Sequence, residues 1–198
     1  MTLTLYGNPF SQCCCRVLVV LYELGLEFTR QNKSQAICRY VVNKYGQESG
    51  LVPLSSDIAA TARFEMAASI EAFDFDPHAS KIWVINYMFP QMRGIAANEA
   101  RLAEEVGWLE KWLEAYNRIL ADRKFVAGDT MTLIDFFHFP YGDGLDEAGY
   151  GDLLHNYPNV SRWWQEISAH PSWVRVKTER EAVKPHILAA LKAEREAK

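Results

Sequence analysis

The sequence predicts an α/β unit followed by an all-helical remainder. Four observations support this fold class. The chain opens with an alternating apolar and polar run, which is typical of a strand, and an apolar helix follows it. A proline-containing stretch after Gly50 reads as a linker, and every later segment has helical periodicity. We therefore expect an α/β domain at residues 1–50, a linker at 51–56 and a helical domain at 57–198.

Four elements are expected before the linker. The first strand carries Leu3 and Leu5 and stops at Gly7-Asn8-Pro9. A helix then begins around Ser11 and ends at Gly25, a residue suited to the turn after a helix. The short run at 27–30 can form a second strand, and Ser34 can cap a second helix.

Helices account for the rest of the chain. The segment 57–76 is expected to be helical until Pro77 interrupts or kinks it, with a further helix at about 79–92. A long helix is expected at about 98–123, and later helices should hold Phe136 and Phe139, then the pair Trp163 and Trp164. The buried face of the long helix should carry Leu102, Val106, Leu109, Leu113, Tyr116 and Leu120.

Charge and cysteine usage exclude several functional classes. The net charge is −4 and the basic residues are scattered, which argues against nucleic-acid binding. No apolar run reaches the roughly 18 residues of a membrane span, and the start lacks the features of a signal peptide, so neither membrane insertion nor secretion is expected. The cysteines at 13, 14, 15 and 38 suit neither disulfides nor a zinc site, and the five histidines are dispersed. We expect a cytoplasmic protein without a metal.

Several polar and aromatic residues are expected to be structural. Thr132 and Asp135 have the spacing of a capping box at a helix start, and His138 lies in an apolar run, as a core histidine would. The run at 73–76 is expected to be a helix end, and the cysteines to be packed. Most aromatic residues between Trp83 and Tyr116 should also be core, although a few could face a cleft.

The order of short motifs resembles that of phi-like glutathione transferases, in which a serine activates the thiol of glutathione. The resemblance implies a thioredoxin-like glutathione-binding domain, a helical bundle, glutathione as co-substrate and a homodimer. The motifs that resemble the family occur near both ends of the chain and through most of its middle. The motifs are Leu5-Tyr6-Gly7-Asn8-Pro9-Phe10-Ser11 with Arg16-Val17-Leu18, Ser34-Gln35-Ala36-Ile37-Cys38-Arg39-Tyr40, Phe73-Asp74-Phe75-Asp76-Pro77, Phe125-Val126-Ala127-Gly128-Asp129 with Thr132-Leu133-Ile134-Asp135, and Tyr157-Pro158-Asn159-Val160 with Trp163-Trp164.

The first domain departs from the family pattern in its length. Eight residues separate Gly25 from Ser34, which is room for one short strand. The family's second helix, third and fourth strands and cis-proline turn therefore have no counterpart. A splice form, a mis-predicted exon, a deletion, or native residues absent between Gln31 and Lys33 would each explain this. Lys33 also stands where the family has a glutamate.

Ser11 is the predicted catalytic residue. The reactive form of a thiol is the thiolate, and lowering a thiol pKa by about 2 units needs about 2.7 kcal/mol of preferential stabilisation. A hydroxyl donor at a helix start, together with the helix dipole, can supply this amount. Ser34, also at a helix start, is predicted to hold the γ-glutamyl carboxylate of glutathione with its hydroxyl and the helix amides, and Lys33 to attract the same carboxylate. Phe10 is predicted to line the electrophile pocket. Either serine could instead be an ordinary helix cap.

Three functions remain open at the level of sequence. The first is an enzyme that joins the glutathione thiolate to small hydrophobic electrophiles. The second is a non-catalytic module kept for dimerisation or partner binding, which the short first domain favours. A glutathione-dependent oxidoreductase is disfavoured, because serine occupies the position of the reactive cysteine.

Overall fold

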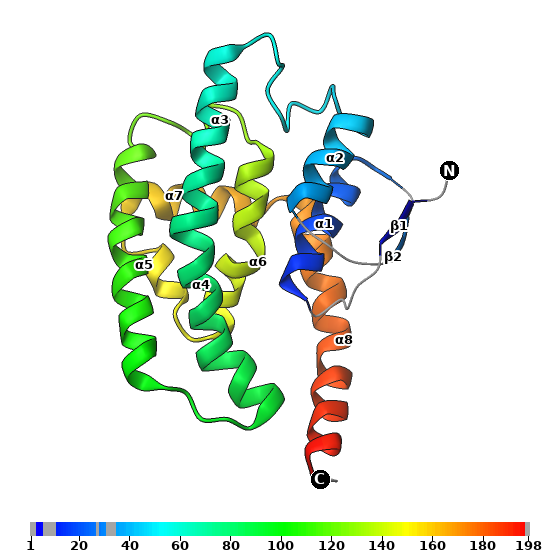
Figure 1. Ribbon diagram of the computed structural model, residues 1–198, viewed down its shortest axis with the longest axis vertical. Helices are drawn as coiled ribbons and strands as arrows, with labels where there is room; N and C mark the ends of the chain where they lie inside the picture. The colour runs from blue at the N-terminus through cyan, green and yellow to red at the C-terminus, as the bar shows by residue number, and fades with distance from the viewer. Residues whose placement is uncertain (1–2, 6–10, 27, 31–34, 197–198) are drawn as a thin grey trace.

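A computed structural model shows a helical protein with one small pair of strands at its edge (Figure 1). It describes residues 3–5, 11–26, 28–30 and 35–196. The first part of the chain forms β1 (Leu3–Leu5), α1 (Gln12–Glu23), β2 (Phe28–Arg30) and α2 (Gln35–Tyr45). The strands pair in parallel with Leu3 opposite Phe28, so α1 is the helical crossover between them. The predicted order of strand, helix, strand and helix is confirmed.

The remainder is a run of packed helices, joined to α2 by the irregular residues 46–57. Its elements are α3 (Ile58–Ile70), the π-helix η1 (Glu71–Phe75), α4 (Asp76–Trp83), the π-helix η2 (Val84–Arg93), α5 (Glu99–Ile119), α6 (Leu133–Glu147), the 3₁₀ turn η3 (Gly151–Leu154), α7 (Pro158–Ser168) and α8 (Pro171–Glu196). In Figure 1 the last turns of α8 extend below the rest of the bundle.

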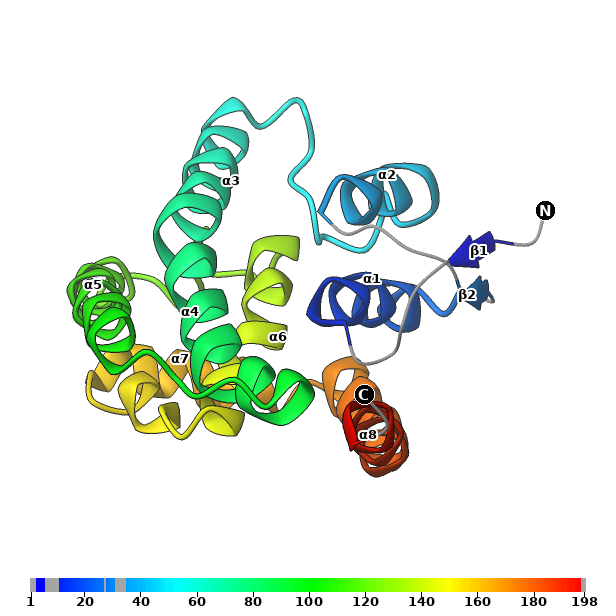
Figure 2. The same cartoon turned by 60° about the horizontal axis from the view of Figure 1, so that its bottom comes forward.

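Helix α1 is the element that joins the two parts. Figure 2 shows it between α2 and α8, with α6 at its side. Because neighbours surround it, every residue from Cys14 to Leu21 is buried, and not only those on one side of the helix. Gly25 follows the helix with φ +61°, a conformation that favours glycine, so the predicted helix stop is confirmed.

The helix is not interrupted at Pro77, as one of the two expected alternatives had it. The chain stays helical from α3 to η2, and the run at 73–76 is not a helix end but the junction of η1 with α4. Pro77 lies in the first turn of α4, directly after η1, and because it has no backbone N–H it donates no hydrogen bond to the turn before it. Phe75 is buried while Phe73 is 75% exposed, because residues two apart lie on nearly opposite sides of a helix.

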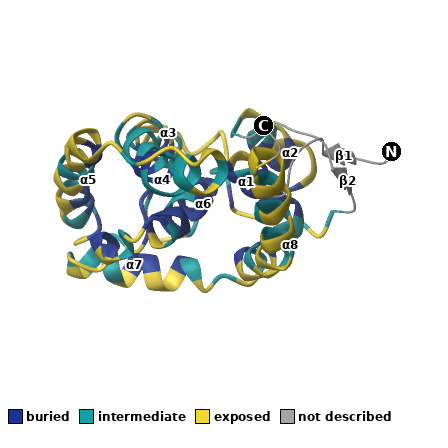
Figure 3. Cartoon of the chain, turned by 90° about the horizontal axis from the view of Figure 1, so that it is seen from below, coloured by how far each residue is buried: buried dark blue, intermediate teal, exposed yellow. Residues whose placement is uncertain are grey.

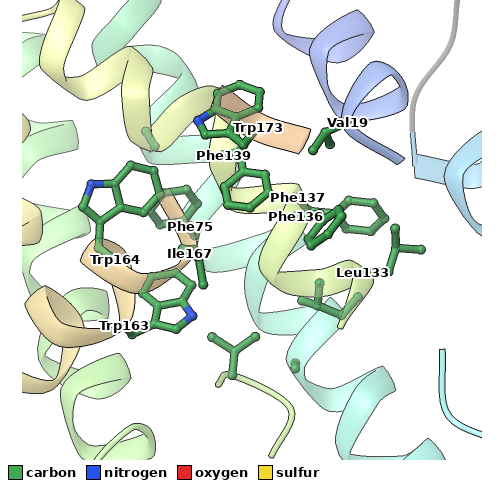
Figure 4. Packing of buried hydrophobic residues seen from close by; sticks show 14 of the residues in the cluster. Val19, Phe75, Leu133, Phe136, Phe137, Phe139, Trp163, Trp164, Ile167 and Trp173 are labelled. Carbon is green, nitrogen blue, oxygen red and sulfur yellow. The ribbon is translucent and has the colours of Figure 1, made fainter. Parts of the chain in front are cut away.

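Aromatic side chains fill the centre of the helical part (Figure 4). The rings of Phe139 and Trp173 stack with centroids 5.1 Å apart. His138 is fully buried; its Nδ1 donates to the Ile134 carbonyl at 2.8 Å and its Nε2 accepts from the Tyr116 hydroxyl at 2.9 Å. Burial lowers the pKa of His138 to about 3, so the ring is neutral. The prediction of a core histidine with its hydrogen bonds made is confirmed.

Burial along the chain corrects two expectations (Figure 3). Of the aromatic residues between Trp83 and Tyr116, only these two are buried, and Trp108 is 44% exposed, because one side of α5 faces away from the bundle. Cys14, Cys15 and Cys38 are buried as expected, but Cys13 is exposed, since it lies at the open start of α1.

The described part of the chain offers neither a membrane-spanning helix nor a metal site of histidine, cysteine and acidic ligands. None of its helices is long and apolar enough to cross a membrane. Within the same residues, no three histidine, cysteine or acidic side chains are grouped so that they could hold a metal ion.

The capping box at the start of α6 is present. Asp135 accepts hydrogen bonds from the Thr132 backbone at 2.8 Å and from its hydroxyl at 3.1 Å. The other carboxylate oxygen accepts from the Val126 backbone and the Trp163 indole, at 3.2 and 2.9 Å. The box therefore connects α6 to the loop before it and to α7.

Replacing Thr132 with alanine should lower the free energy of unfolding by about 1 kcal/mol, because one hydrogen bond of the box is lost. Denaturant unfolding measures this value, and the activity per folded molecule should not change. A loss of activity at an unaltered melting temperature would contradict the structural role.

Candidate active site

A pocket of about 340 Å³ opens beside the start of α1. Three segments far apart in the sequence form it: the first residues of α1, the end of α4 with η2, and the middle of α6. Its lining residues are Ser11, Gln12, Cys13, Trp83, Val84, Met88, Met92 and Tyr141.

Ser11 occupies the cap position of α1, but its hydroxyl does not act as a cap. Its backbone is extended, and its carbonyl accepts from the amides of Cys14 and Cys15 at 2.9 and 3.1 Å. The side chain makes no capping hydrogen bond, and the residue is half-buried at the pocket. The ordinary reason for a serine at a helix start is therefore missing here.

The start of α1 favours a negative charge near that hydroxyl. The first amide groups of any helix have no partner within it, and the helix dipole puts positive potential at this end. The first turn of α1 contains no acidic residue that would compensate this potential. An anionic sulfur at the mouth of the pocket would thus meet a hydroxyl donor and a favourable field.

The far wall of the pocket is apolar and adaptable. Val84, Met88 and Met92 are spaced four residues apart, which places them along one side of η2. Methionine side chains adjust to ligands of different shape. Trp83 forms the end of this wall, and its indole donates to Glu147 at 2.8 Å. Glu147 also accepts from Arg180 and Lys184 of α8, so the C-terminal helix helps to hold the pocket wall.

A buried ionic cluster supports α1 from behind. The Arg16 guanidinium donates to Glu71 at 2.9 Å, to Asp76 at 3.0 Å and to the Phe137 carbonyl at 2.8 Å. Gln35 of α2 donates to the other Glu71 oxygen at 2.9 Å. Burial raises the pKa of Glu71 to about 7 although Arg16 favours its charged form. The cluster joins α1, α2, η1 and α4 beneath the pocket.

The structure describes one of the four predicted site residues. Ser11 lies in the pocket, whereas Phe10, Lys33 and Ser34 lie outside the described residues. Gln35, which follows Ser34, bonds to Glu71, so the start of α2 lies near the cluster that supports α1.

Sequence reasoning missed the rest of the pocket. Only the apolar residues of η2 could have been found from the sequence, because Val84, Met88 and Met92 recur every four residues in a helical segment. Nothing in the sequence indicates that Tyr141 faces the same space.

A larger pocket of about 550 Å³ lies between the linker, α3 and the loop before α6. Its lining includes Gly50, Pro53, Arg63, Asp129 and Thr130, but no residue for which the sequence predicts chemistry. The smaller pocket at Ser11 is therefore the candidate active site.

Comparison with known proteins identifies the family. Residues 75–171 match the model of the glutathione S-transferase C-terminal domain. The chain is 33% identical to glutathione S-transferase PM239X14 of Arabidopsis thaliana, an alignment covering 83% of this chain and 90% of the relative. The chain belongs to the glutathione S-transferase family.

Further relatives agree with the phi-like assignment, which is confirmed. Glutathione S-transferase hmp2 of Hypomyces subiculosus is 32% identical, over 90% of this chain and 99% of that protein. The crystal structure of glutathione transferase F2 from Populus trichocarpa matches with a TM-score of 0.84 and 27% identity, covering 90% of this chain and 99% of that one. The chain is accordingly a transferase with the helical C-terminal domain of this fold.

Proposed function

We propose that this transferase joins the thiolate of glutathione to small hydrophobic electrophiles at the pocket beside α1. One observation carries the proposal: the Ser11 hydroxyl lies at a helix start, makes no capping bond and lines an otherwise largely apolar pocket. The hydroxyl donates to the sulfur, and the helix dipole stabilises the anion further. The apolar wall of η2 receives the electrophile, and Phe10 is proposed to extend that wall.

Glutathione is proposed to lie across the starts of α1 and α2. Ser34 and Lys33 precede α2, where a hydroxyl, a positive charge and helix amides can hold the γ-glutamyl carboxylate. The hydrogen bond from Gln35 to Glu71 supports this arrangement, because it keeps the start of α2 near the cluster behind α1.

We propose that residues 1–50 form a shortened thioredoxin-like domain, that 51–56 are a linker and that 57–198 form the helical domain. The parallel pair β1 and β2 around α1 supports a thioredoxin-like unit. The alignment with PM239X14 has 199 positions, yet 83% of 198 residues is about 164, so about 35 positions hold no residue of this chain. This difference favours the second candidate function, a non-catalytic module for dimerisation or partner binding.

A homodimer in the cytoplasm, acting in detoxification, completes the proposal. Ile58 of α3 and Phe73 of η1 are 80% and 75% exposed, and Met66 between them is 44% exposed. Exposed apolar side chains along one continuous helical segment, here α3 and η1, are suited to contact with a second copy of the chain.

Calorimetric titration with glutathione tests the function. We expect this chain to bind glutathione one to two decades more weakly than a relative that contains the missing positions. The family's cis-proline turn, which has no counterpart in this chain, would pair with the backbone of glutathione, and each of the two hydrogen bonds lost with it is worth about 1 kcal/mol. It should still conjugate a chlorinated nitroaromatic at saturating glutathione. Absence of both binding and turnover would reject the enzyme in favour of the non-catalytic module.

A further inference from the structure

Three sulfur-containing side chains line the pocket beside the start of α1. Cys13 comes from the first turn of α1, whereas Met88 and Met92 come from η2. The two methionines are four residues apart in a helical segment, so their side chains are neighbours on one side of it. Sulfur atoms from two distant parts of the chain thus share a pocket of about 340 Å³.

Packing alone does not require sulfur at these positions. Leucine has nearly the volume of methionine and would form the same apolar wall. Cys13 is exposed, whereas the other three cysteines are buried, so its thiol contributes little to the core. The property that distinguishes these three side chains from plain apolar ones is a soft, polarisable sulfur atom with an electron pair to donate.

The chemistry of the lining selects a soft ion of low charge. Thiolate and thioether sulfur are ligands that Cu(I) prefers, whereas zinc takes thiolate, imidazole or carboxylate, and magnesium takes oxygen. None of the described residues that line the pocket is a histidine, an aspartate or a glutamate. One thiolate balances the charge of one Cu(I) ion, and a neutral centre of this kind costs little to hold against an apolar wall.

A buried amide at the same pocket also lacks a partner. Gln12 is 3% exposed, and neither its side-chain nitrogen nor its side-chain oxygen has a hydrogen-bond partner among the residues that the structure describes. Buried polar groups without partners are uncommon, and a bound ion is one of the explanations for them. Gln12 precedes Cys13 and lines the pocket with it, so its amide nitrogen is available to donate to a metal-bound thiolate.

We propose that Cys13, Met88 and Met92 bind one Cu(I) ion in the pocket beside α1. The Cys13 thiol releases its proton to solvent as the copper–sulfur bond forms, and the two thioethers each donate an electron pair without a change in protonation. The dipole of α1 stabilises the thiolate in its first turn. The site requires neither glutathione nor an electrophile, so it goes beyond the proposed transferase function.

Anaerobic titration of the whole chain with Cu(I), in competition with the chromophoric chelator bicinchoninate, measures the affinity. The wild type should take up one ion per chain from the chelator. Met88→Leu and Met92→Leu should each weaken binding at least about tenfold, and Cys13→Ser by more, because even the loss of a group that only orients a metal ligand costs about 10–100-fold. The leucine variants conserve apolar volume, so their melting temperatures should stay close to that of the wild type.

X-ray absorption at the copper edge identifies the ligands directly. The wild type should show a shell of sulfur alone, and each leucine variant should show one sulfur fewer. Met66→Leu is the matched control, because Met66 lies on α3, is 44% exposed and is not among the residues that line the pocket. Its affinity for Cu(I) should equal that of the wild type.

Four results would each overturn the inference. They are a wild type that takes no copper from the chelator, a copper shell of nitrogen or oxygen, an affinity that Cys13→Ser or either leucine variant leaves unchanged, and an equal loss in Met66→Leu. Cys13→Ser keeps the three buried cysteines, so it also shows whether those thiols capture the ion instead. No conjugation rate enters the test, and failure of the proposed transferase function would therefore leave its outcome unaffected.

Discussion

Replacing Ser11 with alanine should lower kcat for a chlorinated nitroaromatic about a hundredfold at saturating glutathione, the usual effect of removing one donor to a developing anion. The pKa seen in the pH–rate profile should also rise toward the roughly 8.5 of a free thiol, because the thiolate loses its donor. Steady-state kinetics across pH measures both effects.

The stability of Ser11→Ala separates catalysis from capping. The Ser11 side chain makes no capping hydrogen bond, so this variant should unfold at nearly the wild-type denaturant concentration. Ser11→Thr, which keeps a hydroxyl, should retain much of the activity. An unchanged rate together with a stability loss of about 1 kcal/mol would show that Ser11 is an ordinary cap and would remove it from the mechanism.

Replacing Arg16 with methionine should destabilise the protein by about 3–5 kcal/mol, because Glu71 would be left buried without its charged partner. The side chains of Arg16 and Glu71 are 3% and 0% exposed, so water cannot take the place of the lost guanidinium. Such a loss is a large part of the roughly 5–15 kcal/mol that holds a domain folded. Denaturant unfolding measures it.

The double variant Arg16→Met with Glu71→Met is the matched control. With both charges removed, stability should return to within about 1 kcal/mol of the wild type. The loss in the single variant should also shrink as the pH falls from about 7 toward 4.5. Glu71, whose folded pKa is raised to about 7 even beside Arg16, then takes up a proton in the folded state before it does so in the unfolded one. A single variant as stable as the wild type at pH 7 would contradict the importance of the cluster.

Local patterns were enough to predict most helices and much of the core. The face of α5 follows the helical period, and of its predicted residues only Val106 is not fully buried. The capping box and the stop at Gly25 depend on neighbouring residues, so the sequence reveals them directly. Periodicity did not reveal where the chain leaves the α-helical repeat, at η1 and η2, because no propensity in the sequence marks a π-helical turn.

The candidate site could be predicted only at one residue. Ser11 stands in a recognisable motif at a helix start, but its partners come from segments separated by 70 to 130 residues. Arg16 meets Glu71 and Asp76 across 55 and 60 positions. Such contacts depend on how whole helices pack, and residue spacing within one helix carries no information about them.

Gln12 is 3% exposed, and its side-chain amide has no hydrogen-bond partner among the residues that the structure describes, which bears on how this protein could be engineered. A buried amide that finds no hydrogen bond lowers folding stability by about 1–3 kcal/mol, so leucine at position 12 is a candidate for a more heat-resistant chain. Selection for thermal resistance alone would tend to replace this residue, although it lines the candidate active site. A screen of variants should therefore score conjugation activity together with melting temperature, because a stabilising substitution at this position also changes the lining of the pocket.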